Sequence, residues 1–210
     1  KHSRWIFRDY DCFDGLLVCL VMNMSQEIPA STFTADLVFL NKLSSFFKWH
    51  FEKGMGFGEN DTWWRGVGVR THPHEGVDLC YYTNVRGRRV YLGLDTYIPP
   101  LYPGEVIKVF DDFIGQTILL KHVFFNEKDC QLYSMYGHVN PLFHITAGQE
   151  IDCTEKIATI ADTALKNRPM LSHLHISTLW LPRSFPAETV EWGMENDTAV
   201  RFCDPLEFFE

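Results

Sequence analysis

The stretch His72-Pro73-His74-Glu75-Gly76-Val77-Asp78 holds candidate metal ligands in a segment that has to bend. His74 and Asp78 are four residues apart, a spacing that suits one metal ion on a helix. Pro73 and Gly76 disfavour a helix, and a straight strand would hold the two Cα atoms roughly 13 Å apart. We therefore expect the chain to bend near Gly76, so that both side chains reach one point.

A second stretch, Ser172-His173-Leu174-His175-Ile176-Ser177, supplies histidines with a different spacing. The apolar run from Leu171 to Leu179 predicts a strand, so the imidazoles of His173 and His175 leave the same face, with Cα atoms roughly 7 Å apart. One can then bind a metal ion while the other reaches what the metal holds. His74, Asp78 and one of these histidines would give three N/O ligands and an open fourth position, which is the arrangement of a catalytic zinc.

Each motif alone is more often a polar loop or a surface strand than a metal site. Their combination changes this balance, because seven of the nine histidines fall between His72 and His175. One of these is His138, in Tyr136-Gly137-His138-Val139 at the end of another predicted strand. A catalytic metal site needs such a histidine to move protons, in addition to those that bind.

The order of these motifs resembles the lysostaphin-type (LytM-like) zinc endopeptidases, which cut peptide cross-links of bacterial peptidoglycan. The resemblance covers roughly residues 65 to 180. It is carried by Arg70, His74-Glu75-Gly76-Val77-Asp78, Tyr136-Gly137-His138 and His173-Leu174-His175, and by the intervening segments Tyr102-Pro103-Gly104-Glu105-Val106, Ile118-Leu119-Leu120-Lys121-His122 and Gly148-Gln149-Glu150-Ile151.

The resemblance implies a role for each of five side chains. The zinc (Zn2+) ligands would be His74, Asp78 and His175, and His138 and His173 would be a catalytic pair that does not bind metal. His72 competes with His74 for the ligand position, and the spacing to Gly76 and Asp78 favours His74. The lead into the last motif, Pro169-Met170-Leu171-Ser172, departs from the family pattern and changes the expected wall of the cleft.

The resemblance further implies peptidoglycan peptides as substrate and a location in the cell envelope, periplasmic or secreted. Which of His138 and His173 acts as the base stays open. Glu75 is a weaker candidate, because the H-E-X-X-H arrangement needs a helix with a second histidine where Asp78 stands. Two other functions also stay open: a non-catalytic activator of cell-wall amidases, and a zinc hydrolase acting on another substrate.

Residues from Trp63 to Thr178 alternate between short apolar runs and Gly, Pro or Asn, which predicts an antiparallel β architecture. The resemblance sharpens this to a β-sandwich or barrel-like fold with a duplicated hybrid motif. The predicted strands are Val67 to Arg70, Val77 to Tyr82, Arg89 to Leu94, Val106 to Phe110, Thr117 to His122, Leu132 to Tyr136, Ile157 to Ala161 and Leu171 to Thr178.

The N-terminal part is predicted to be an appendage packed on the catalytic unit, with residues 1–60 in the first and 61–210 in the second. Leu16 to Met22 follow acidic residues rather than a basic region, which favours a buried strand over a signal peptide. Thr34 to Lys53 read as a helix, because Thr34 can cap it, Leu37, Leu40, Leu43 and Phe47 recur near helical spacing, and Gly54 can end it.

Composition limits the classes of protein further. The 210 residues, 46% hydrophobic and 15% aromatic, suffice for a full-sized core. A net charge of −8 and a pI near 5.6 give no basic surface for nucleic acid. No apolar run approaches the roughly 20 residues of a membrane span. The six cysteines form no C-X-X-C pair, which favours buried small apolar side chains, with one or two disulfides left open.

Overall fold

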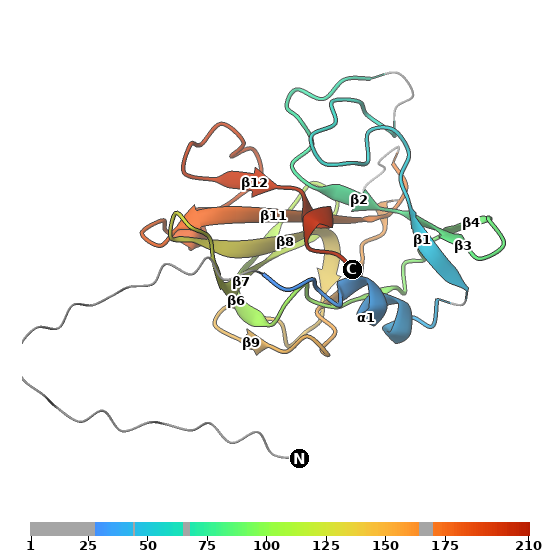
Figure 1. Ribbon diagram of the computed structural model, residues 1–210, viewed down its shortest axis with the longest axis horizontal. Helices are drawn as coiled ribbons and strands as arrows, with labels where there is room; N and C mark the ends of the chain where they lie inside the picture. Colours follow the sequence, from blue (N-terminus) through green and yellow to red (C-terminus); the bar gives the residue numbers. More distant parts are fainter. Residues whose placement is uncertain (1–27, 44, 65–67, 164–169) are drawn as a thin grey trace, which may run out of the picture.

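The computed structural model describes residues 28–43, 45–64, 68–163 and 170–210, and its fold is mainly antiparallel β (Figure 1), as predicted. The elements are, in chain order, α1 (Phe33–Leu40), β1 (Phe46–His50), β2 (Val77–Leu79), β3 (Tyr81–Asn84), β4 (Arg89–Tyr91), β5 (Tyr97–Ile98), β6 (Gly104–Asp111), β7 (Gln116–Phe125), β8 (Cys130–Pro141), β9 (Glu150–Ile151), β10 (Ala158–Ile160), β11 (Leu174–Pro182), η2 (Ala187–Thr189), β12 (Arg201–Cys203) and η3 (Pro205–Glu207).

A nine-stranded sheet forms the centre of the molecule. Its main path runs β12-β11-β8-β7-β6-β9, with β2 paired to the side of β11, β10 to β8 and β5 to β10. Every strand pair in this sheet is antiparallel. The sheet is open, so the barrel-like variant of the predicted fold is not formed. A second sheet, in the order β1-β3-β4, completes the strands.

The central strands bury both faces, as the alternation of side chains along β11 shows. Leu174 and Ile176 lie in the larger apolar cluster, which also takes up Phe33 and Leu37 of α1. Leu179 and Leu181, of opposite parity, lie in a smaller cluster on the other face. Figure 1 shows α1 beside the C-terminus, where Phe33 stacks on Phe209 with ring centroids 5.0 Å apart.

The helix predicted over Thr34 to Lys53 is wrong in its second half. The helix begins at Phe33 and ends at Leu40, and Thr32, not Thr34, is its N-cap. Lys42 and Ser45 then adopt left-handed φ values of 50° and 64°, and the chain continues as β1. β1 pairs with β3, and the ring of Phe46 lies 5.4 Å from that of Tyr82. Aromatic pairing across strands therefore overrides an apolar spacing that also suited a helix.

Several other predictions meet the structure only in part. Leu16 to Met22 and two of the cysteines, Cys12 and Cys19, lie outside the described residues. Of the four described cysteines all are free, and Cys80 alone is buried. Within the described part of the chain, no helix has the length and apolar character to cross a membrane. The boundary near residue 60 stays a prediction.

The predicted bend at Gly76 is a place where the backbone passes close over β11. A Cβ atom at this position would lie 2.2 Å from the Ile176 carbonyl oxygen and 2.6 Å from His175 Nε2. Since these distances are far below van der Waals contact, only glycine lets the chain approach β11 so closely.

We expect Gly76→Ala to lower the free energy of unfolding by about 1 to 3 kcal/mol, because the added methyl group forces β2 away from β11. Urea unfolding of the metal-free protein measures the change. Gly93→Ala is the matched control, since a Cβ atom there meets nothing within 4 Å. Equal stability of the two variants would show that the close approach at Gly76 does not constrain the fold.

Candidate metal centre

Pairing of β2 with β11 places Asp78 directly opposite His175. Val77 and Leu79, on either side of Asp78, enter the larger apolar cluster, so Asp78 points away from it. His175 has the same relation to Leu174 and Ile176. Asp78 Oδ1 and His175 Nδ1 consequently lie 2.9 Å apart, although the residues are 97 positions apart in the chain.

His74 enters the same site from the segment before β2. Its backbone is held by the preceding loop, because its N–H donates to the Glu59 carbonyl and its own carbonyl accepts from Gly58. Its Nε2 lies 3.1 Å from His175 Nδ1 and 3.3 Å from Asp78 Oδ1. The three side chains are buried, and their ligand atoms all lie within 4.8 Å of one another.

The outer hydrogen-bond partners of His74 and His175 are compatible with lone pairs on the two ring nitrogens that face Asp78. His74 Nδ1 lies 3.0 Å from the Gly56 carbonyl oxygen, which only accepts, so Nδ1 is protonated and a neutral ring leaves Nε2 unprotonated. His175 Nε2 lies 2.8 Å from Ser177 Oγ, which can accept a hydrogen bond, and with the proton on Nε2 the lone pair of Nδ1 faces Asp78 Oδ1. Two nitrogen lone pairs and a carboxylate oxygen then face one point, an arrangement that fits a bound cation such as zinc.

The second oxygen of Asp78 is occupied by donors from another segment. Oδ2 accepts from Trp63 Nε1 at 2.7 Å and from Arg70 Nη2 at 3.4 Å. Burial alone would raise the pKa of Asp78, but His74 and His173 hold it well below its usual value. Burial lowers the pKa of His175 to about 3 against the opposing effect of Asp78. An ionised carboxylate and a neutral imidazole are the forms that bind metal.

The other two predicted residues, His138 and His173, lie beside the three grouped ligand residues and are not part of that group. His173 shares a face with His175, and its Nε2 lies 3.4 Å from Asp78 Oδ1. Its Nδ1 lies 2.8 Å from the Leu171 carbonyl oxygen, which fixes the proton on Nδ1 and leaves Nε2 able to accept one. The ring of His138 lies 5.0 Å from that of His173 and 5.8 Å from that of His175. The structure thus brings all five predicted side chains together.

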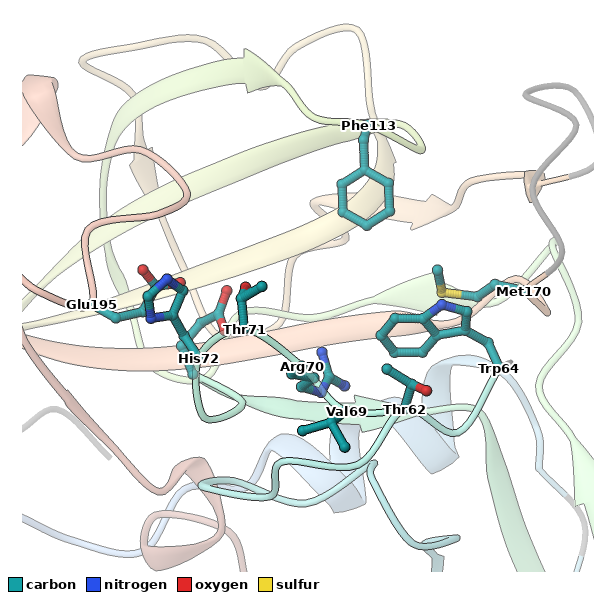
Figure 2. A pocket seen from close by; sticks show the side chains of 10 residues that line it. Thr62, Trp64, Val69, Arg70, Thr71, His72, Phe113, Met170 and Glu195 are labelled. Carbon is teal, nitrogen blue, oxygen red and sulfur yellow. The ribbon is translucent and has the colours of Figure 1, made fainter. Parts of the chain in front are cut away.

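A cleft of about 400 Å³ lies beside the cluster (Figure 2). A narrower cavity extends it inward to Asp78, His138, His173 and His175. His72 is exposed and lines the outer cleft, so it lies apart from the grouped ligand atoms, and His74 occupies the position that the spacing favoured. Glu75 lies in the wall, where burial raises its pKa. The walls shared by the two spaces are Trp64, Arg70, Glu75, Phe113 and Met170.

Four residues of the centre were not predicted from the sequence. Trp63 and Trp192 are aromatic side chains in irregular segments: Trp63 donates to Asp78, and the Trp192 ring lies 5.0 Å from that of His175. Asp112, in the β6–β7 turn, contacts His138, and Glu195 lines the outer cleft. The only signal available for Asp112 was the turn-forming sequence around Gly115.

No protein-family model matches the sequence, and no curated protein is significantly similar to it. Among solved structures, the chain is similar to the catalytic domain of the antimicrobial peptidase lysostaphin from Staphylococcus simulans, at 16% identity over 71% of this chain and 90% of that one, with a TM-score of 0.43. It is also similar to a mutant catalytic domain of the prophage-encoded M23 protein EnpA from Enterococcus faecalis, at 19% identity over 63% of this chain and 85% of that one, with a TM-score of 0.37.

A third similar structure is the SpoIIQ–SpoIIIAH pore-forming complex, at 14% identity over 71% of this chain and 70% of that one, with a TM-score of 0.39. A lysostaphin-type fold is thus found among the structures similar to this chain.

We expect about one zinc ion per chain, and we expect His74→Ala, Asp78→Ala and His175→Ala each to lose it, because each removes one of three converging donor atoms. Elemental analysis after dialysis measures the zinc content. His72→Ala is the matched control and should keep the metal. Loss of zinc in His72→Ala with retention in His74→Ala would overturn the ligand assignment.

Proposed function

We propose that this protein is a zinc-dependent endopeptidase that hydrolyses peptide bonds in the stem or cross-bridge peptides of peptidoglycan. The observation that carries the proposal is the convergence of His74 Nε2, Asp78 Oδ1 and His175 Nδ1, where Asp78 and His175 line the inner end of a cleft together with two further imidazoles. Three protein ligands with an open position are typical of catalytic zinc rather than of structural zinc. The peptidoglycan substrate and the envelope location are taken from the resemblance of the motifs.

A zinc ion bound by these ligands supplies Lewis-acid chemistry toward water and the peptide carbonyl group. Side chains of the protein would carry out the proton transfers. His173, with its Nε2 unprotonated, is placed to accept or return a proton at the inner end of the cleft. His138 lies beside it, with its ring between those of His173 and Phe113. Together they can take a proton from water and deliver one to the leaving amine.

The cleft walls support a role in holding an extended chain away from bulk water. Trp64 stacks under the Arg70 guanidinium, whose carbon lies 4.6 Å from the ring centroid, and this fixes one wall. Phe113 lies across the cleft from Trp64 (Figure 2). The narrow inner cavity leaves little room beside the scissile bond, which favours peptides of small residues such as alanine and glycine.

We expect His138→Ala and His173→Ala to keep zinc and to lose peptidase activity by a factor of ~10² or more, because general acid–base groups contribute that much. Zinc content and initial rates of peptide release are measured together on each variant. His144→Ala, a histidine outside the centre, is the control and should match the wild type. Full activity in either site variant would remove that histidine from the mechanism.

Mass spectrometry of fragments from purified sacculi tests the substrate. We expect new peptide termini within stem or bridge peptides, and their loss when a chelator removes the metal. The net charge of −8 predicts that the rate responds less steeply to salt than that of a cationic lytic enzyme. Absence of new termini in a zinc-loaded protein that hydrolyses another substrate would refute the peptidoglycan assignment. Absence of any hydrolysis would favour an activator of cell-wall amidases.

A further inference from the structure

His138 occupies an irregular position in β8. Gln116 of β7 pairs with Val139 of β8, and Ile118 pairs with Tyr136, so that Gly137 and His138 together face the single residue Thr117. This is the pattern of a β-bulge, and His138 has a left-handed φ of 61°. A bulged residue leaves the hydrogen-bond ladder, so the His138 N–H needs another acceptor.

Asp112, in the turn between β6 and β7, supplies that acceptor. Its Oδ2 accepts from the His138 N–H at 2.8 Å and lies 3.2 Å from His138 Nδ1. The carboxylate side chain is fully buried. Burial raises the pKa of Asp112, but the contacts with His138 and the turn hold it below its usual value, so that the group is ionised.

The two oxygens of Asp112 have different partners, which separates a local structural role from one directed at His138. Oδ1 accepts from the backbone N–H groups of Ile114 and Gly115 at 2.8 and 2.6 Å and so closes the turn. Oδ2 is not needed for this. It accepts instead from Thr117 Oγ1 at 2.9 Å and from His138, and Trp192 Nε1 donates to Thr117 Oγ1 at 3.0 Å.

A second observation, the position of His138 Nδ1, also links this histidine to Asp112. This nitrogen is buried and makes no regular hydrogen bond within the described residues, although Asp112 Oδ2 is 3.2 Å away. A carboxylate oxygen can only accept, so this contact favours a proton on Nδ1. The neutral ring then carries its lone pair on Nε2. His173 is paired at Nδ1 with a backbone carbonyl instead, so the two imidazoles differ in the charge of their partner.

We propose that Asp112 is a positioning residue for His138: it holds the bulged backbone and keeps the ring in the Nδ1–H tautomer, which leaves Nε2 free to exchange protons with the substrate. The part of this proposal that concerns hydrolysis rests on the proposed function. The tautomer and its dependence on Asp112 can be measured without it.

Kinetics of Asp112→Asn give the first test, with Asp111→Asn as the matched control on an exposed neighbouring carboxylate. We expect Asp112→Asn to keep zinc and to lower kcat by about tenfold or more with KM changed by less than about twofold, while Asp111→Asn has no effect. If Asp112 acts through His138, the same change in the His138→Ala background costs less than about twofold. Equal losses in both backgrounds would overturn the proposal and leave Asp112 a structural residue.

Nitrogen-15 NMR of the histidine side chains gives the second test, on the purified protein with the His138 signals assigned by their loss in His138→Ala. We expect the Nδ1–H tautomer of His138 in the wild type and in Asp111→Asn, and its loss in Asp112→Asn. An Nε2–H tautomer in the wild type would refute the positioning role, even if Asp112→Asn does not fold. An Nδ1–H tautomer in a protein that cleaves no peptide would instead refute the proposed function and leave the contact with Asp112 intact.

Discussion

The buried carboxylate of Asp78 is the group on which the arrangement of the site depends. It is 2% exposed, and the idealised cost of burying an unpaired charge is far larger than the net stability of a domain. Asp78 offsets part of this cost at Oδ2, which accepts hydrogen bonds from Trp63 and Arg70, while its Oδ1 faces the ring nitrogens of the histidines. Loss of any one of these segments would leave a charge buried without its partners.

The same carboxylate explains why the centre is suited to a cation. With the proton of His74 on Nδ1, beside the Gly56 carbonyl, and that of His175 on Nε2, beside the Ser177 hydroxyl, lone pairs of His74 Nε2 and His175 Nδ1 face Asp78 Oδ1, with separations of 2.9 to 3.3 Å. Three acceptors this close repel one another unless a proton or a metal ion lies between them. The carbonyl of Gly56 and the hydroxyl of Ser177 are the outer partners that ligating histidines usually have, and they orient both rings.

Much of the fold and of the metal centre could be predicted from the sequence, for a physical reason. Alternation along a strand is a local property, so His173 and His175 could be assigned to one face, and Gly76 could be identified as a bend. Pairing between distant segments is not local, and this is where prediction failed. The spacing of apolar residues predicts a helix over Phe46–His50, but the aromatic partners of this segment lie in β3, so it forms a strand. Trp63 and Asp112 could not be predicted, because their hydrogen-bond partners lie in other elements.

The bulge in β8 shows how one irregularity places a side chain that the strand pattern would misdirect. In a regular strand, His138 would share the face of Tyr136, which lies in the larger apolar cluster with Val139. The extra residue at Gly137 and His138 lets the ring turn toward His173 and Trp192 instead. This arrangement requires glycine at position 137, because a Cβ atom there would lie 2.8 Å from the Trp192 ring. The ladder hydrogen bond that His138 gives up is replaced by Asp112, so the defect in the sheet and the geometry of the site are one feature.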